Sequence, residues 1–113
     1  MAQKTAYVTG GMGGIGTTMC QRLSKDGFKV IAGCGPSRDH VKWLGEQRAL
    51  GYTFHASVGN VSDWDSTVAA FEKVRAEHGD VHVLVNNAGI TRDGLFRKLS
   101  PAAWHTVIYT NLT

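Results

Sequence analysis

The residues best suited to chemistry lie near the N-terminus, where five of the eight residues from Thr9 to Gly16 are glycine. They follow a short apolar run and precede a segment with apolar residues at helical spacing. The free amide groups at the start of a helix, together with its dipole, favour an anion. Glycine permits the tight turn and lets a phosphate approach the backbone closely. The stretch therefore predicts a nucleotide diphosphate over residues 13–15, and a flexible turn without a ligand is the alternative.

The elements that position this stretch alternate along the chain. Apolar runs predict strands over residues 6–8, 28–34, 52–58 and 81–85. Helical spacing or end signals predict helices over residues 14–25, 39–50 and 62–78, and a fourth helix from Ser100. Alternating apolar strands and helices indicate a parallel sheet covered on both faces. With right-handed crossovers, this order predicts an α/β fold, an incomplete Rossmann-like doubly wound parallel sheet of about four strands and four helices.

The end of the second predicted strand indicates which dinucleotide would bind. NAD-selective sites of this type place a carboxylate there to accept from the ribose hydroxyls, and the sequence has Gly35 and Arg38 but no carboxylate at the strand end. A missing carboxylate removes repulsion against a 2′-phosphate, and a guanidinium can pair with that phosphate. We therefore predict NADP(H) as the cofactor, although Asp39 follows directly. A solvated surface charge is the alternative interpretation of Arg38.

Three motifs in chain order resemble those of the short-chain dehydrogenases/reductases. They are TGxxxGIG from Thr9 to Gly16, NNAG from Asn86 to Gly89, and Asn111 within Thr-Asn-Leu. The resemblance covers the whole chain and implies that Asn111 is the catalytic asparagine, which holds a water in a proton relay. It also implies a set of cofactor-binding residues: Gly10, Met12, Gly13, Gly14, Ile15, Gly16, Gly35, Arg38, Gly59, Asn60, Val61, Asn87, Ala88, Gly89, Ile90 and Thr91.

Within that family, four longer stretches resemble the NADPH-dependent reductases of 3-oxoacyl thioesters. They are YVTGGMGGIG, AGCGP, GNVSDWDST and NNAGITRDGLFRKL. The resemblance implies an acyl-CoA or acyl-carrier-protein thioester as substrate, Asp93 as a substrate-binding residue, and a homotetrameric parent enzyme. The alternatives are a family member that acts on a sugar or steroid alcohol, and a non-catalytic nucleotide-binding module.

The family's catalytic tyrosine, followed four residues later by a lysine, does not occur in these 113 residues. Tyr7, Tyr52 and Tyr109 are followed at that spacing by glycine, alanine and threonine. A lysine at that spacing would share a helix face with the phenol and lower its pKa. The resemblance therefore implies that residues 1–113 are the N-terminal cofactor-binding part of a single Rossmann-like domain. We expect the catalytic C-terminal part to be absent, which makes the chain a fragment that is inactive alone.

Composition excludes several other classes of function. The formal net charge of +3 is small and scattered, which argues against a nucleic-acid partner. No apolar run approaches the roughly 20 residues that span a bilayer, and the N-terminus has no signal-type pattern, so we expect a cytoplasmic protein without a membrane partner. The two cysteines and five histidines show no metal-ligand spacing, so we expect no metal site.

Overall fold

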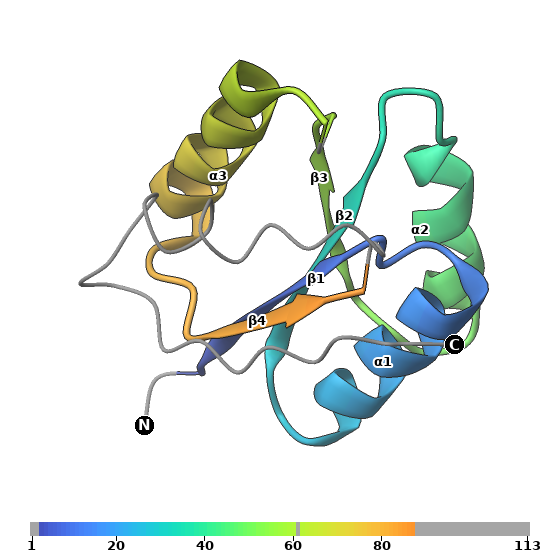
Figure 1. The fold of residues 1–113 in the computed structure, drawn as a ribbon. Helices are drawn as coiled ribbons and strands as arrows, with labels where there is room; N and C mark the ends of the chain where they lie inside the picture. The colour runs from blue at the N-terminus through green and yellow to red at the C-terminus, as the bar shows by residue number, and fades with distance from the viewer. Residues whose placement is uncertain (1–2, 61, 88–113) are drawn as a thin grey trace.

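The computed structural model describes residues 3–60 and 62–87, which form a parallel sheet flanked by helices (Figure 1). The sheet order is β3-β2-β1-β4, with every pairing parallel. The elements are β1 (Thr5–Thr9), α1 (Gly14–Lys25), β2 (Lys29–Cys34), α2 (His40–Ala49), β3 (His55–Val58), α3 (Trp64–His78) and β4 (Val83–Asn86). This order confirms the predicted doubly wound α/β fold. The helix predicted from Ser100 lies outside the described residues.

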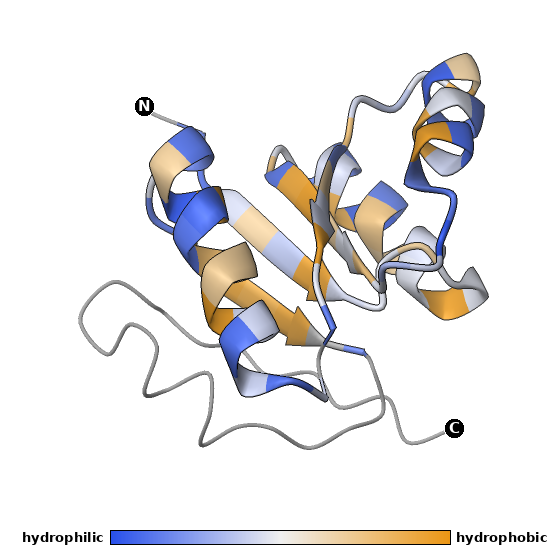
Figure 2. Ribbon diagram, turned by 90° about the horizontal axis from the view of Figure 1, so that it is seen from above, coloured by the Kyte–Doolittle hydropathy of each residue, from blue (hydrophilic) through white to orange (hydrophobic). Residues whose placement is uncertain are grey.

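Helices cover both faces of the sheet because successive residues of each strand point to opposite sides. On one face, Val8 of β1 packs in a cluster with Cys20 of α1 and Trp43 of α2. On the other face, Tyr7 packs in a separate cluster with Phe71 of α3. Figure 2 shows this apolar sheet lying between the helices, whose outer surfaces carry hydrophilic residues. The central strands are buried on both faces, as the apolar runs predicted.

Three of the predicted elements begin two or three residues later than predicted, among them β4, which begins at Val83 rather than at residue 81. The third helix begins at Trp64 with Asp63 as its N-cap, two residues later than predicted, because Ser62 donates its backbone N–H and its hydroxyl to the Asn60 side chain instead of capping the helix. The third strand begins at His55 rather than at residue 52. The Tyr52 N–H donates to the carbonyl of Gln47 in α2, so this part of the chain belongs to the end of the helix.

The face that α2 buries also differs from the apolar spacing in the sequence. Trp43 and Gln47 are the buried residues of this helix, whereas Val41 and Leu50 are 70% and 66% exposed. Residues four apart lie on the same face of a helix, so Gln47 is buried together with Trp43. The Trp43 indole donates a hydrogen bond to Thr17 of α1 (3.0 Å), which ties the two helices together. No helix within residues 3–60 and 62–87 is both long and apolar enough to cross a membrane.

Candidate nucleotide-binding site

The glycine-rich turn joins the carboxyl end of β1 to the start of α1. Gly10 has a φ of 60°, a conformation that favours glycine, and turns the chain out of the strand. The Gly13 N–H donates to the Gly10 carbonyl (3.3 Å), which closes the turn. At Gly16 a side chain has no room, because a Cβ would overlap the Gly10 carbonyl oxygen. The absence of a side chain at Gly16 therefore lets the first turn of α1 pack directly on the backbone of the loop.

The N-terminus of α1 is left open for an anion. Its N-cap is Gly13, which supplies no side-chain acceptor, and its first turn contains no acidic residue. The first helical hydrogen bond runs from the Thr17 N–H to the Gly13 carbonyl (2.8 Å), so the amides of residues 14–16 precede it. Such amides and the helix dipole attract negative charge. Ile15 is 48% exposed beside them. The Met12 side chain is buried in the core, which leaves only its backbone for a ligand.

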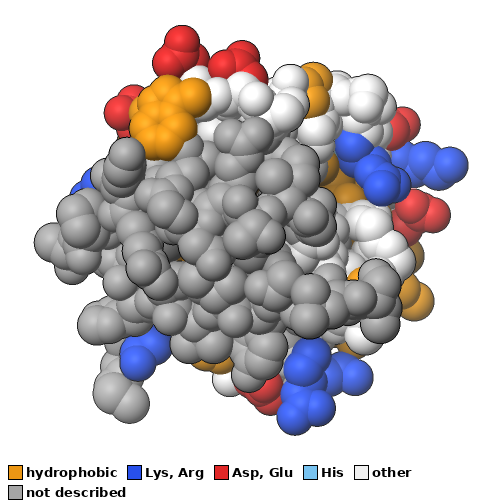
Figure 3. Space-filling view, in the orientation of Figure 1, with side chains coloured by type: hydrophobic (Ala, Val, Ile, Leu, Met, Phe, Trp, Pro, Cys, Tyr) orange, Lys and Arg blue, Asp and Glu red, His pale blue; other side chains and the backbone are white. Residues whose placement is uncertain are grey.

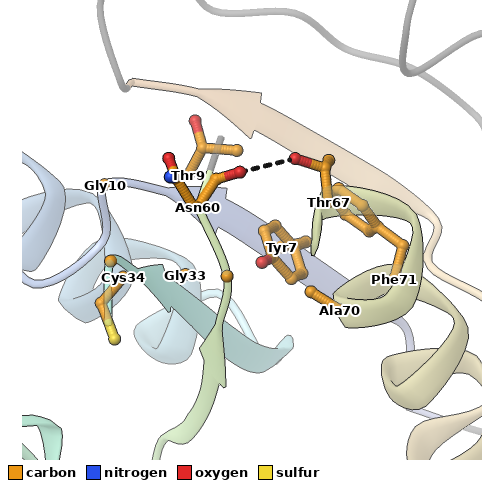
Figure 4. Close-up of a pocket in the computed structure, with 11 residues that line it drawn as sticks. Tyr7, Thr9, Gly10, Gly33, Cys34, Asn60, Thr67, Ala70 and Phe71 are labelled. Atoms are coloured by element: carbon orange, nitrogen blue, oxygen red, sulfur yellow. Dashed lines mark hydrogen bonds between the residues drawn. The ribbon is translucent and has the colours of Figure 1, made fainter. Parts of the chain in front are cut away.

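A pocket opens beside this turn, at the carboxyl ends of β1, β2 and β3 and against α3 (Figure 4). Its volume is about 150 Å³. Parallel α/β sheets bind ligands outside the carboxyl ends of their strands. The predicted residues Gly10, Gly35, Gly59 and Asn60 all line the pocket. The sequence prediction missed the other lining residues, which are Tyr7, Thr9, Gly33, Cys34, Thr67, Ala70 and Phe71.

Asn60 offers the pocket a donor rather than an acceptor. Its side-chain oxygen accepts from the Ser62 N–H (3.1 Å) and from the Ser62 hydroxyl (2.6 Å). Its backbone carbonyl accepts from the Thr67 hydroxyl (3.1 Å), and its N–H donates to the Ser66 hydroxyl (2.9 Å). The side-chain NH₂ is thus the group that remains for a ligand. The ring nitrogens of adenine are acceptors that match such a donor.

An open hollow of about 660 Å³ adjoins the pocket at Gly35. It is lined by Gly35, Ser37, Arg38, Asp39, Lys42, Trp43 and Glu46. The Asp39 side chain accepts from the Lys42 backbone N–H (3.1 Å) and caps α2, so this carboxylate already has a backbone partner. Lys42, which the sequence prediction did not include, brings a second cation to the hollow, four residues after Arg38. In Figure 3, Lys and Arg side chains gather over α2 and the far end of α1, beside acidic ones.

Asn87 connects the glycine-rich turn to the end of β4. Its side-chain NH₂ donates to the Gly10 carbonyl (3.3 Å), and its backbone N–H donates to the Thr9 hydroxyl (2.9 Å). The Thr9 hydroxyl in turn donates to the Val85 carbonyl (3.4 Å). Asn87 is thus held against the glycine-rich turn. The remaining predicted site residues lie outside the described part of the chain: Val61, Ala88, Gly89, Ile90, Thr91, Asp93 and Asn111.

Among the described residues, no group of three or more His, Cys, Asp or Glu side chains is arranged to hold a metal ion. Burial raises the pKa of the Cys20 thiol to about 12, and this thiol donates to the Gly11 carbonyl in the core. Burial also raises the pKa of Cys34. Burial therefore favours the neutral form of both thiols.

Comparison with known proteins gives concordant matches. The family model for short chain dehydrogenase matches residues 4–113. The chain is 66% identical to the acetoacetyl-CoA reductase of Cupriavidus necator, over 100% of this chain and 46% of that protein. It is 40% identical to the 3-oxoacyl-acyl-carrier-protein reductase FabG of Escherichia coli, over 97% of this chain and 44% of that protein. The chain therefore spans about half the length of these relatives.

A solved structure provides the corresponding match in three dimensions. An actinorhodin polyketide ketoreductase variant, crystallised with NADPH, superposes with a TM-score of 0.70 at 28% identity. The superposition covers 86% of this chain and 40% of that chain.

Proposed function

Because this chain belongs to the short chain dehydrogenase family, we propose that it is the NADP(H)-binding part of an acetoacetyl-CoA reductase. The single observation that carries the proposal is the 66% identity, over the entire chain, to a protein of that name. The reaction would convert acetoacetyl-CoA to (R)-3-hydroxybutyryl-CoA, a precursor of polyhydroxybutyrate. Residues 1–113 would supply the cofactor-binding part of a single Rossmann-like domain.

The residues of the site have distinct roles in this proposal. The open amides of residues 14–16 bind the diphosphate, and the pocket beside Gly10 and Asn60 takes the adenine ring. Arg38 and Lys42, in the adjoining hollow, pair with the 2′-phosphate. Asn87, held at the carboxyl end of β4, borders the nicotinamide ribose together with residues 88–91. When bound, NADPH supplies a hydride for the 3-keto carbon of the substrate.

The cofactor assignment is tested by titrating the purified protein with NADPH and NADH, with Arg38→Ala as the variant. A charge-assisted hydrogen bond contributes about 1.5–3 kcal/mol, so NADPH affinity is expected to fall roughly 10- to 100-fold while NADH affinity stays the same. Arg48→Ala, in the last turn of α2, removes one positive charge outside the hollow and is the matched control. Equal losses in the two variants would refute the assignment of Arg38.

The choice of acyl carrier is a separate part of the proposal. Acetoacetyl-CoA is favoured over the carrier-protein thioester because identity to the reductase from C. necator is 66%, against 40% for FabG. The intact gene product is expected to oxidise NADPH faster with acetoacetyl-CoA than with the same acyl group on carrier protein. A preference for the carrier protein would move the assignment to the fatty-acid enzyme. NADPH binding without turnover of either thioester would favour a non-catalytic module.

The assignments that rest on the family resemblance alone belong to the same proposal. Asn111 would hold the relay water, and Asp93 would contact the substrate. The parent enzyme would be a homotetramer. It would be cytoplasmic, since NADPH and acyl-CoA thioesters are metabolites of that compartment. Asn111→Ala is expected to lower turnover without changing NADPH affinity. Size-exclusion chromatography with light scattering measures the assembly, and a monomer would contradict this part.

A further inference from the structure

Tyr7 reaches across three strands of the sheet. It belongs to β1, yet its hydroxyl donates a buried hydrogen bond to the hydroxyl of Ser57 in β3 (2.9 Å). Gly33 of β2 lies between them and pairs with Ser57 in the strand register. A Cβ on Gly33 would lie 2.7 Å from the Tyr7 hydroxyl oxygen and 3.0 Å from the ring. The absence of a side chain at Gly33 therefore provides the space that the phenol occupies.

The same phenol lines the inner part of the nucleotide pocket. Its ring faces Phe71 of α3 with the centroids 4.6 Å apart, and both rings line the pocket. Figure 4 shows Tyr7 on its strand beside the Phe71 and Thr67 side chains of the helix. The Tyr7 phenol is protonated at neutral pH and donates to Ser57, and burial raises its pKa further, to about 12. This hydrogen bond fixes the ring at the inner end of the pocket.

The size of the pocket limits what it can hold. Sites that bury a whole drug-sized ligand are about 300–1,000 Å³, whereas this pocket is about 150 Å³, which suits one planar ring system. The ribose and phosphates have to stay at the mouth, near Gly10 and Gly35. The edge of the base that is remote from the ribose therefore faces inward, toward Tyr7.

On the basis of the proposed nucleotide-binding function, we propose that Tyr7, which packs against Gly33 and donates a hydrogen bond to Ser57, sets the depth of the pocket for the base. The pocket would then accept a purine no larger than adenine. Tyr7 is a positioning residue in this account, since it shapes the pocket and carries no reacting group. Its role is visible as selectivity between bases of different size rather than as affinity alone.

The test compares NADP⁺ with 1,N⁶-etheno-NADP⁺, whose additional ring enlarges the edge of adenine that faces inward. The wild-type protein is expected to bind the etheno analogue at least about tenfold more weakly, in the range that small steric differences produce. Tyr7→Val removes the ring and is expected to reduce that preference about tenfold. Tyr7→Phe keeps the ring, loses only the hydrogen bond, and is the matched control that retains most of the preference. A general loss of stability would weaken both ligands alike.

Gly33→Ala probes the same contact while keeping the tyrosine. The added methyl group collides with the phenol, so the ring has to shift into the pocket, and NADP⁺ affinity is expected to fall about tenfold or more. Adding Tyr7→Val removes the atoms that collide and is expected to restore binding. If Tyr7→Val leaves the ratio of the two dissociation constants (etheno analogue to NADP⁺) unchanged, or if Gly33→Ala leaves the affinity for NADP⁺ unchanged, the role of Tyr7 is overturned. The proposed nucleotide-binding function would stand in either case. Failure of the wild-type protein to bind NADP⁺ would overturn the proposed function as well.

Discussion

Replacing Gly16 by alanine is expected to separate the architecture of the glycine-rich turn from its ligand chemistry. A Cβ at Gly16 would overlap the Gly10 carbonyl oxygen and come within 2.7 Å of the Gly11 Cα. Both neighbours are backbone atoms of a closed turn, so they cannot rotate away and α1 has to shift. Overpacking of this kind costs about 1–3 kcal/mol, and rigid neighbours place the variant near the upper end. The melting temperature would fall about 4–8 °C for each kcal/mol in a domain of about 100 residues.

Gly14, two residues earlier in the same helix, supplies the control. A Cβ at Gly14 has no atom within 4 Å, so Gly14→Ala meets no obstacle and gains helix propensity of up to about 1 kcal/mol. Free energies of unfolding come from urea titrations followed by far-UV circular dichroism, with and without NADPH. Gly14→Ala is expected to be at least as stable as the wild type but to bind NADPH less tightly, because its methyl group lies where the diphosphate approaches. Equal stability of the two variants would refute the packing argument for Gly16.

Three further outcomes follow from the described contacts. Asp39→Asn keeps the cap of α2 but removes a negative charge from the hollow, so NADPH affinity is expected to rise in titrations. Asp39→Ala removes the cap and is expected to cost about 1 kcal/mol of stability. Burial lowers the pKa values of His55 and His78, whose rings are 4.7 Å apart, below the ordinary value of 6.5. The folded state therefore binds fewer protons than the unfolded state, and the free energy of unfolding should decline as the pH falls below about 6.5. The double variant His55→Gln/His78→Gln is expected to flatten this slope. Trp43→Phe removes the hydrogen bond to Thr17 and is expected to lower the free energy of unfolding, measured in urea, by about 1 kcal/mol. An unchanged free energy of unfolding would show that this hydrogen bond does not stabilise the fold.

The fold and the geometry of the glycine-rich turn were predictable because their signals are local. The apolar runs determined the four strands, and their alternation with helices required parallel pairing. The turn from Gly10 to Gly16 is specified by residues that are neighbours in sequence. The position of Arg38 near the carboxyl end of β2 was likewise predictable, because it is four residues beyond Cys34, and Arg38 lines the hollow there.

The inner part of the pocket was not predictable from local signals. Tyr7 and Ser57 are 50 residues apart, and their contact depends on the strand order and on Gly33 standing between them. Thr67 and Phe71 reach the pocket only through the packing of α3 on the sheet. An asparagine side chain can both donate and accept hydrogen bonds, and only the Ser62 contacts show that the Asn60 side-chain oxygen is already engaged.

The contacts of Asn87 also bear on how this edge of the sheet opens. The side chain of Asn87 holds the Gly10 carbonyl while its backbone holds Thr9, which itself bonds to Val85. The glycine-rich turn and the end of β4 are 77 residues apart in the chain, yet neither can separate from the sheet without breaking bonds to the other. We therefore expect them to open as one cooperative unit of local unfolding, with amide hydrogens that exchange with solvent together. A ligand that holds either segment closed protects both.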